Sequence, residues 1–265
     1  MPLSRSSRWL FVGMVVGALV VRPGQGFAQV AVQMKDGRLS LSLDGDGNVI
    51  GAGAEWLQVH DLAGGEEFVG VPVAGSAGGR FEGVALGLRF AGQWKTLGEA
   101  AELRCEVSAD PPRDRAIVVR VALPLRAEGW TWWDDLGTGR VIEGGKHYTR
   151  TLPWGDGHEP GAYPLCAVSG PRLGLSLAVP LHEPRICRLA YDASRQALEA
   201  EFDLGLSPEA ARLGCRADFR LLVYAHDPHW GFRDALRRYY GFFSQYAERR
   251  APRGGIWLLG FTPDA

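Results

Sequence analysis

Residues 198–204 read Leu-Glu-Ala-Glu-Phe-Asp-Leu, so that apolar and charged side chains alternate along the segment. Because successive side chains of a β-strand point to opposite faces of its sheet, this pattern predicts a strand with one buried and one wetted face. Segments 38–43, 116–125 and 217–225 also alternate. Strands with one polar face are typical of antiparallel sheets that are solvated on that side.

Turn-forming residues separate these alternating segments. The 265 residues include 36 Gly and 16 Pro, and Gly-Gly pairs stand at 64–65, 78–79 and 144–145. The chain between Val30 and Ala225 has room for about a dozen or more strands, and closed or paired sheets would protect their edges. No internal repeat is visible, which disfavours a propeller. We therefore expect an all-β fold, a large antiparallel β-super-sandwich over residues 29–226.

The first 28 residues have the features of a secretory signal peptide. Arg5 and Arg8 precede an apolar stretch over 9–21, and the small residues Gly26 and Ala28 provide a cleavage site. An uncleaved membrane anchor is the less favoured alternative, because the apolar stretch is short for a bilayer span. We expect a periplasmic or secreted protein with no membrane span after cleavage of the signal.

Charge and cysteine spacing narrow the classes of partner. The formal net charge is −1, and no basic run offers a surface for nucleic acid. The four cysteines do not have the C-x-x-C spacing of a redox or zinc site. They could form two disulfide bonds or remain four free thiols. Cys105 lies in an alternating segment that places it on the inner face of a strand. The cysteines are Cys105, Cys166, Cys187 and Cys215.

The pattern changes after Ala225. Asp227 and Pro228 can begin a helix, and aromatic and apolar residues then recur every three or four positions, with arginines on the other side. We expect a helical linker over 227–253. The continuous apolar segment 256–261 predicts one further strand, within 254–265, of the kind that is buried on both faces of a parallel sheet. The helical residues are Phe232, Leu236, Tyr239, Tyr240 and Phe243, and the arginines are Arg233, Arg237 and Arg238.

Motifs in a fixed order carry a resemblance to a known family. They are Trp-Thr-Trp-Trp-Asp-Asp-Leu at 130–136, Tyr-Pro-Leu at 163–165, Gly-Leu-Ser-Leu-Ala-Val-Pro at 174–180, Phe-Asp-Leu-Gly-Leu-Ser at 202–207, and Asp-Pro-His-Trp-Gly-Phe-Arg at 227–233. This order resembles the N-terminal galactose-mutarotase-like domain of bacterial glycoside-hydrolase-like proteins, in which a helical linker leads into a (β/α)₈ barrel. The resemblance implies that the chain ends at the first barrel strand and that the barrel is a missing partner. It also implies no catalytic residue here, because catalytic carboxylates of such families lie on the barrel.

Two segments carry side chains that could contact a carbohydrate, through aromatic stacking or hydrogen bonds to hydroxyl groups. Each also has a structural interpretation, because aromatic residues fill cores and polar loops connect sheets. Asp134 and Asp135 point to opposite faces if they lie on one strand, unlike the facing carboxylates of a glycosidase. The candidate ligand-binding residues are Trp130, Trp132, Trp133, Asp134, Asp135, Trp154, His158 and Glu159.

The sequence does not show a recognised metal or cofactor motif. His226 and His229 flank the expected helix start, and H-E-x-x-H is absent. The acidic turn at 44–48 is followed by Val49 where an EF-hand loop requires Gly. We therefore expect no metal and no cofactor.

Three functions stay open. The first is an exported, non-catalytic β-domain that supports the barrel of a carbohydrate-active enzyme and helps to shape its substrate cleft. The second is a stand-alone carbohydrate-binding or interaction module centred on Trp130–Trp133. The third is mutarotase-like or lyase activity of the sandwich itself, through Asp135, His158 or Glu159. The first also predicts an exposed apolar helix face, so that residues 29–265 aggregate more than a chain ending near Ala225.

Overall fold

The computed structural model describes residues 29–43, 49–65, 67–75, 77–152, 163–210, 212 and 214–248. The predicted signal peptide and the predicted strand at 254–265 lie outside these residues, as do Trp154, His158 and Glu159. Within the described ranges, no helix is both long and apolar enough to cross a membrane.

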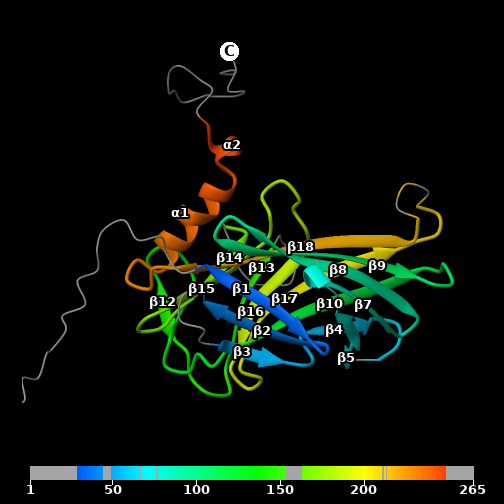
Figure 1. Cartoon of the computed structure of the whole chain (residues 1–265), viewed down its shortest axis with the longest axis horizontal. Coiled ribbons are helices and arrows are strands. Elements are labelled where there is room, and N and C mark those ends of the chain that lie inside the picture. The colour runs from blue at the N-terminus through cyan, green and yellow to red at the C-terminus, as the bar shows by residue number, and fades with distance from the viewer. Residues whose placement is uncertain are drawn as a thin grey trace, which may run out of the picture.

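Eighteen strands of the described residues form three antiparallel sheets (Figure 1). The smallest sheet has the order β1 (Val30–Lys35), β2 (Arg38–Leu43), β3 (Val49–Gly53). The second has the order β13 (His147–Leu152), β16 (Cys187–Asp192), β17 (Ala197–Leu206), β10 (Arg115–Pro124), β4 (Leu57–Asp61), β5 (Val69–Gly70). The third has the order β12 (Gly139–Val141), β11 (Thr131–Trp133), β14 (Leu165–Ser169), β15 (Gly174–Ala178), β18 (Arg216–His226), β9 (Ala100–Ala109), β8 (Leu88–Leu97), β7 (Arg80–Ala85), β6 (Val73–Gly75), with a 3-10 turn at Ala77–Gly79. The predicted all-β sandwich is confirmed.

The main core lies between the six-stranded and nine-stranded sheets. In β17, the strand predicted from residues 198–204, Leu198 and Phe202 point into this core and are fully buried. Phe202 stacks on Phe219 of β18 with the ring centroids 4.4 Å apart, which joins the two sheets. The charged residues of β17 lie on the opposite face, but Glu199 is also fully buried there. The alternation predicts a wetted face here, and the burial of Glu199 shows that this face is partly covered.

All four cysteines are buried free thiols, which settles the choice left open by their spacing. Cys105 lies on the inner face of β9, as its alternating segment predicts. Burial raises the pKa of Cys166 and of Cys187 to about 12. Thiolates are the reactive form of cysteine, so burial disfavours reaction at these two thiols.

Helix α1 (Phe232–Phe242) packs on the outer face of the nine-stranded sheet, and α2 (Ser244–Ala247) follows it after a break at Phe243 (Figure 1). A second buried cluster forms there, from the side chains of the sheet that point away from the main core. The buried residues of this cluster are Ala100, Leu165, Ala167, Ala178, Leu222, Tyr224, Phe232, Ala235, Tyr239 and Phe243. The helix is thus part of the sandwich domain rather than a free connection.

Two details of the expected helix are wrong. The helix begins at Phe232 rather than at Asp227, because residues 228–231 form turns and Asp227 Oδ1 accepts a hydrogen bond from the backbone N–H of His229. Arg238, expected on the exposed side, is only 7% exposed. It pairs with Asp234 and Glu99, which is why the binary pattern of the helix misplaces it.

The buried helix face reverses the expected order of solubility. A chain ending near Ala225 loses α1 and exposes the outer apolar cluster of the nine-stranded sheet, so we expect it to aggregate more than residues 29–265. Sedimentation of the two proteins at equal concentration measures this difference. Greater aggregation of the longer protein would show that α1 does not stay docked in solution.

Candidate functional site

The segment Trp130–Asp135 forms strand β11 and the turn that follows it. Strand β11 pairs with β12 on one side and with β14 on the other. Alternation directs Trp132 into the main core, where it is fully buried, and Trp133 to the opposite face, toward α1. Trp130 is half-buried against the main core. Trp132 therefore offers no ring face for stacking on a sugar in this structure, whereas Trp133 lies close to the surface.

The two adjacent aspartates hold the turn between β11 and β12. Asp134 accepts two hydrogen bonds from Arg140, at 2.5 Å from Nε and 2.6 Å from a terminal nitrogen. Asp135 Oδ1 accepts the backbone N–H groups of Gly137 and Thr138, both at 2.7 Å. These backbone hydrogen bonds lower the pKa of Asp135. The lowered pKa makes Asp135 a poor general acid, since efficient general acids have a pKa near the working pH, and Asp134 is engaged by Arg140.

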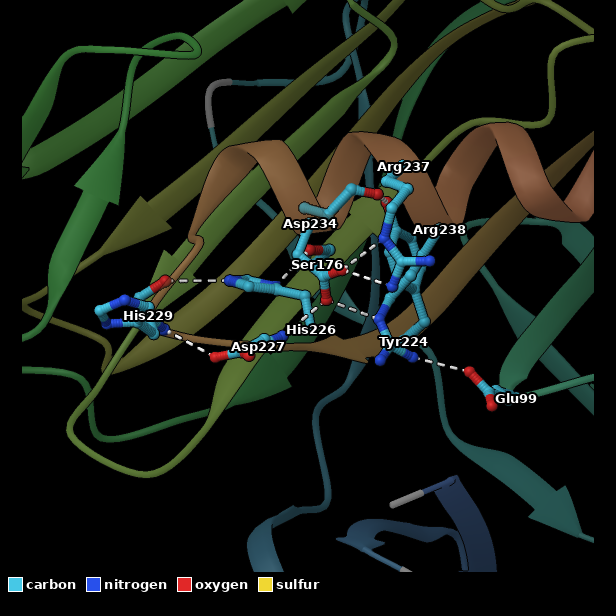
Figure 2. A network of polar contacts seen from close by, with 11 residues as sticks. Glu99, Ser176, Tyr224, His226, Asp227, His229, Asp234, Arg237 and Arg238 are labelled. Carbon is cyan, nitrogen blue, oxygen red and sulfur yellow. Dashed lines mark hydrogen bonds and ion pairs between the residues drawn. The ribbon is translucent and has the colours of Figure 1, made fainter. Parts of the chain in front are cut away.

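A chain of hydrogen bonds leads from Trp133 into the sheet. The Trp133 indole N–H donates to Ser169 Oγ at 2.9 Å, Ser169 Oγ lies 2.9 Å from His226 Nε2, and His226 Nδ1 lies 2.8 Å from Ser176 Oγ (Figure 2 shows His226 and Ser176). The indole can only donate, so Ser169 Oγ accepts its hydrogen bond, and the His226 ring lies between the hydroxyl groups of Ser169 and Ser176. Burial lowers the pKa of His226 to about 3, so the imidazole is neutral.

A polar network around a buried ion pair within α1, between Asp234 and Arg238, connects the helix to Glu99 and to the backbone of Asp227 (Figure 2). Asp234 Oδ2 accepts the backbone N–H of Asp227 at 2.8 Å and Arg238 Nε at 2.7 Å, while Oδ1 accepts two bonds from Arg237. Arg238 also donates to Glu99 Oε2, at 2.6 Å, in the turn before β9. Burial alone would raise the pKa of Asp234, but these hydrogen bonds bring it below its ordinary value. Asp234 is therefore an ionised structural group.

A surface pocket of about 300 Å³ opens beside this network. Trp230, with 57% of its surface exposed, supplies an aromatic face. Arg233 Nε donates to the carbonyl oxygen of Leu136 at 3.1 Å, which brings the turn after β11 next to the pocket. The lining residues are Asp227, Trp230, Arg233, Asp234 and Arg237. Sequence reasoning does not single out Trp230, which lies in a turn between the last strand and the helix.

The outer face of the six-stranded sheet carries a second polar group that sequence reasoning missed. Arg120 bonds Glu201 Oε1 at 2.8 Å through Nε and at 2.6 Å through a terminal nitrogen, and its Nε lies 3.6 Å from Glu199 Oε2. The ring of Phe68 covers Arg120, with the guanidinium carbon 3.4 Å from the ring centroid. Burial raises the pKa of Glu199 to about 7. The alternating acids of β17 are the available signal, but alternation alone predicts a solvated face for them.

Comparisons with known proteins identify a shared fold. No family model matches the chain, and no curated protein matches it. A solved structure of a polysaccharide lyase matches with a TM-score of 0.50 and 15% identity, over 83% of this chain and 35% of that chain. A solved structure described as an aldose 1-epimerase from Klebsiella pneumoniae subsp. pneumoniae gives a TM-score of 0.35 and 16% identity, over 68% of this chain and 58% of that chain. The chain thus shares a β-sandwich fold with part of the lyase and spans about a third of its length.

Proposed function

We propose that this chain is a non-catalytic β-sandwich domain of a carbohydrate-active protein, and that it binds carbohydrate at the Trp230 pocket. The observation that carries the proposal is the exposed Trp230 ring beside arginines, in a pocket whose carboxylates are already bonded. The fold shared with part of a polysaccharide lyase supports a link to carbohydrate. The signal-peptide features of residues 1–28 add that the protein is exported. The resemblance of the motifs adds that a (β/α)₈ barrel completes the enzyme, whose substrate cleft the sandwich helps to shape.

The chemistry of the pocket favours an acidic sugar. An indole ring provides a flat apolar face for the C–H side of a sugar ring. A guanidinium group presents paired N–H donors that match the geometry of a carboxylate. Among the described residues, the hydrogen bonds found for Arg233 use only its Nε. Its remaining N–H donors are therefore suited to a uronic acid carboxylate.

The same pocket is not built for general acid catalysis. Asp234 accepts four hydrogen bonds and has a lowered pKa, so it does not carry a proton to donate at neutral pH. Asp227 Oδ1 accepts a backbone hydrogen bond within its own turn. Glycoside hydrolysis requires one carboxylic acid and one carboxylate across a sugar, and this pocket supplies no such pair. We therefore assign binding to this pocket and no bond cleavage.

A stand-alone carbohydrate-binding module is the second candidate. It uses the same Trp230 pocket and needs no barrel, and Trp133 approaches this surface from β11 through its contact with Gly231. The two candidate functions differ in whether the sandwich contacts a barrel, and both place carbohydrate at the Trp230 pocket.

Affinity electrophoresis tests the binding site. We expect the protein to be retarded in gels that contain a uronic acid polysaccharide, and less in gels with a neutral glucan. The change Trp230→Ala removes the stacking face and weakens binding at least about tenfold, which corresponds to about 1.4 kcal/mol. The matched control is Tyr246→Ala, which removes another exposed aromatic ring, on α2.

Equal retardation of Trp230→Ala and the unchanged protein would contradict the site. Release of unsaturated sugars or reducing ends from these polysaccharides by the purified protein would contradict the non-catalytic role. Retardation of the unchanged protein by every polysaccharide alike would contradict the preference for acidic sugars.

A further inference from the structure

Three potential metal ligands meet on the outer face of the six-stranded sheet. His147 of β13 is paired with Asp192 of β16, and Asp192 is paired with Ala197 of β17. Glu199 follows two positions after Ala197 and thus points to the same face of the sheet. One ligand atom of each of the three residues lies within 4.8 Å of the others. Three adjacent strands therefore bring together one imidazole and two carboxylates.

The buried carboxylate of this group lacks a partner for one oxygen. Glu199 is fully buried, and its Oε2 accepts a bond from Arg195 at 2.8 Å. Its Oε1 has no hydrogen-bond partner among the described residues. An unsatisfied buried polar atom costs about 1–3 kcal/mol, and more when the group is charged. A bound cation would satisfy this oxygen.

The charged groups around Glu199 have a net negative charge that favours a bound cation. Four carboxylates are linked here by ion pairs to three guanidinium groups, so the group carries one net negative charge when Glu199 is ionised. The carboxylates are Asp192, Glu199, Glu201 and Asp203, and the guanidinium groups are Arg120, Arg188 and Arg195.

We propose that His147, Asp192 and Glu199 bind a zinc ion. Zinc takes histidine nitrogen and carboxylate oxygen together, often with three protein ligands and a water, whereas calcium and magnesium prefer oxygen ligands alone. Arg195 lies 3.1 Å from Asp192 Oδ2, and its side chain is 41% exposed, so it can turn to solvent when the ion enters. His147 is exposed and gives the ion a path from solvent.

Zinc titration of the purified protein, after treatment with EDTA and dialysis, tests the proposal. Isothermal titration calorimetry is expected to show one zinc per chain. The change His147→Gln removes the exposed ligand without altering the core, and we expect it to weaken zinc binding at least about tenfold. His229→Gln, at an exposed histidine in the turn before α1, is the matched control and leaves binding unchanged. Glu199→Gln, which keeps the shape of the side chain, also weakens binding.

The absence of zinc binding by the folded protein would overturn the proposal, as would equal affinity of His147→Gln and the unchanged protein. Binding of calcium as tightly as zinc would also overturn it, because it would indicate general attraction to acidic groups. The site is separate from the Trp230 pocket, which lies beside α1 on the nine-stranded sheet. Retardation by polysaccharide therefore tests the proposed function independently of this result.

Discussion

The change Asp234→Ala is expected to lower the free energy of unfolding by about 3–5 kcal/mol. Asp234 and Arg238 form a buried ion pair, and each side chain is only 6% exposed. Removal of the carboxylate takes from the buried Arg238 guanidinium its partner within the helix, while the ion pair with Glu99 stays. It also leaves the backbone N–H of Asp227 without its acceptor. Urea unfolding followed by circular dichroism measures the loss.

Arg237→Ala is the matched control for this ion pair. Arg237 also bonds Asp234, at 2.6 Å, but its side chain is 68% exposed. Exposed ion pairs contribute about 0–1 kcal/mol, so we expect a small change. Similar losses for the two variants would contradict the claim that the buried part of the network holds α1 in place.

The change Trp132→Ala is expected to cost about 3–5 kcal/mol of stability, since it leaves a cavity in the core. The Trp132 ring is fully buried near the ring of Tyr148, with centroids 6.2 Å apart. The indole N–H also donates to Asp134 Oδ1 at 3.1 Å. We expect the midpoint of thermal unfolding to drop by a large amount. The fraction of the protein that folds is expected to retain carbohydrate binding.

Trp230→Ala provides the comparison for the tryptophans. Its ring is 57% exposed, so its removal is expected to change stability by no more than about 0.5 kcal/mol. The two variants should thus separate stability from binding. A stable Trp132→Ala protein that has lost carbohydrate binding would contradict this division of roles.

Much of the fold could be predicted from alternation alone. Residues 198–204 became β17, and 217–225 became the centre of β18, because their apolar side chains fill one inner face. The position of α1 could not be predicted, since its aromatic face fits a contact with another domain as well as a contact with its own sheet. Arg238 was misplaced because a charged residue is assigned to solvent unless its partners, here Asp234 and Glu99, are known.

The candidate site was predicted only in part. The segment Trp130–Asp135 does lie next to the pocket, but alternation within β11 sends Trp132 to the core and Trp133 to the outer face. Trp230 is identified as a candidate by its exposure in the structure and not by its sequence pattern. The group of His147, Asp192 and Glu199 comes from three strands, and its sequence spacing has no motif that a metal search would find.

The most direct test of carbohydrate binding at the Trp230 pocket is the indole N–H spectrum of protein labelled with ¹⁵N-tryptophan. The sequence contains nine tryptophans, and Trp230→Phe assigns the signal of Trp230. On addition of a uronic acid oligosaccharide, we predict that the Trp230 signal shifts most, and that the signals of the buried Trp56, Trp94 and Trp132 stay in place. An unchanged Trp230 signal at saturating oligosaccharide would contradict the account.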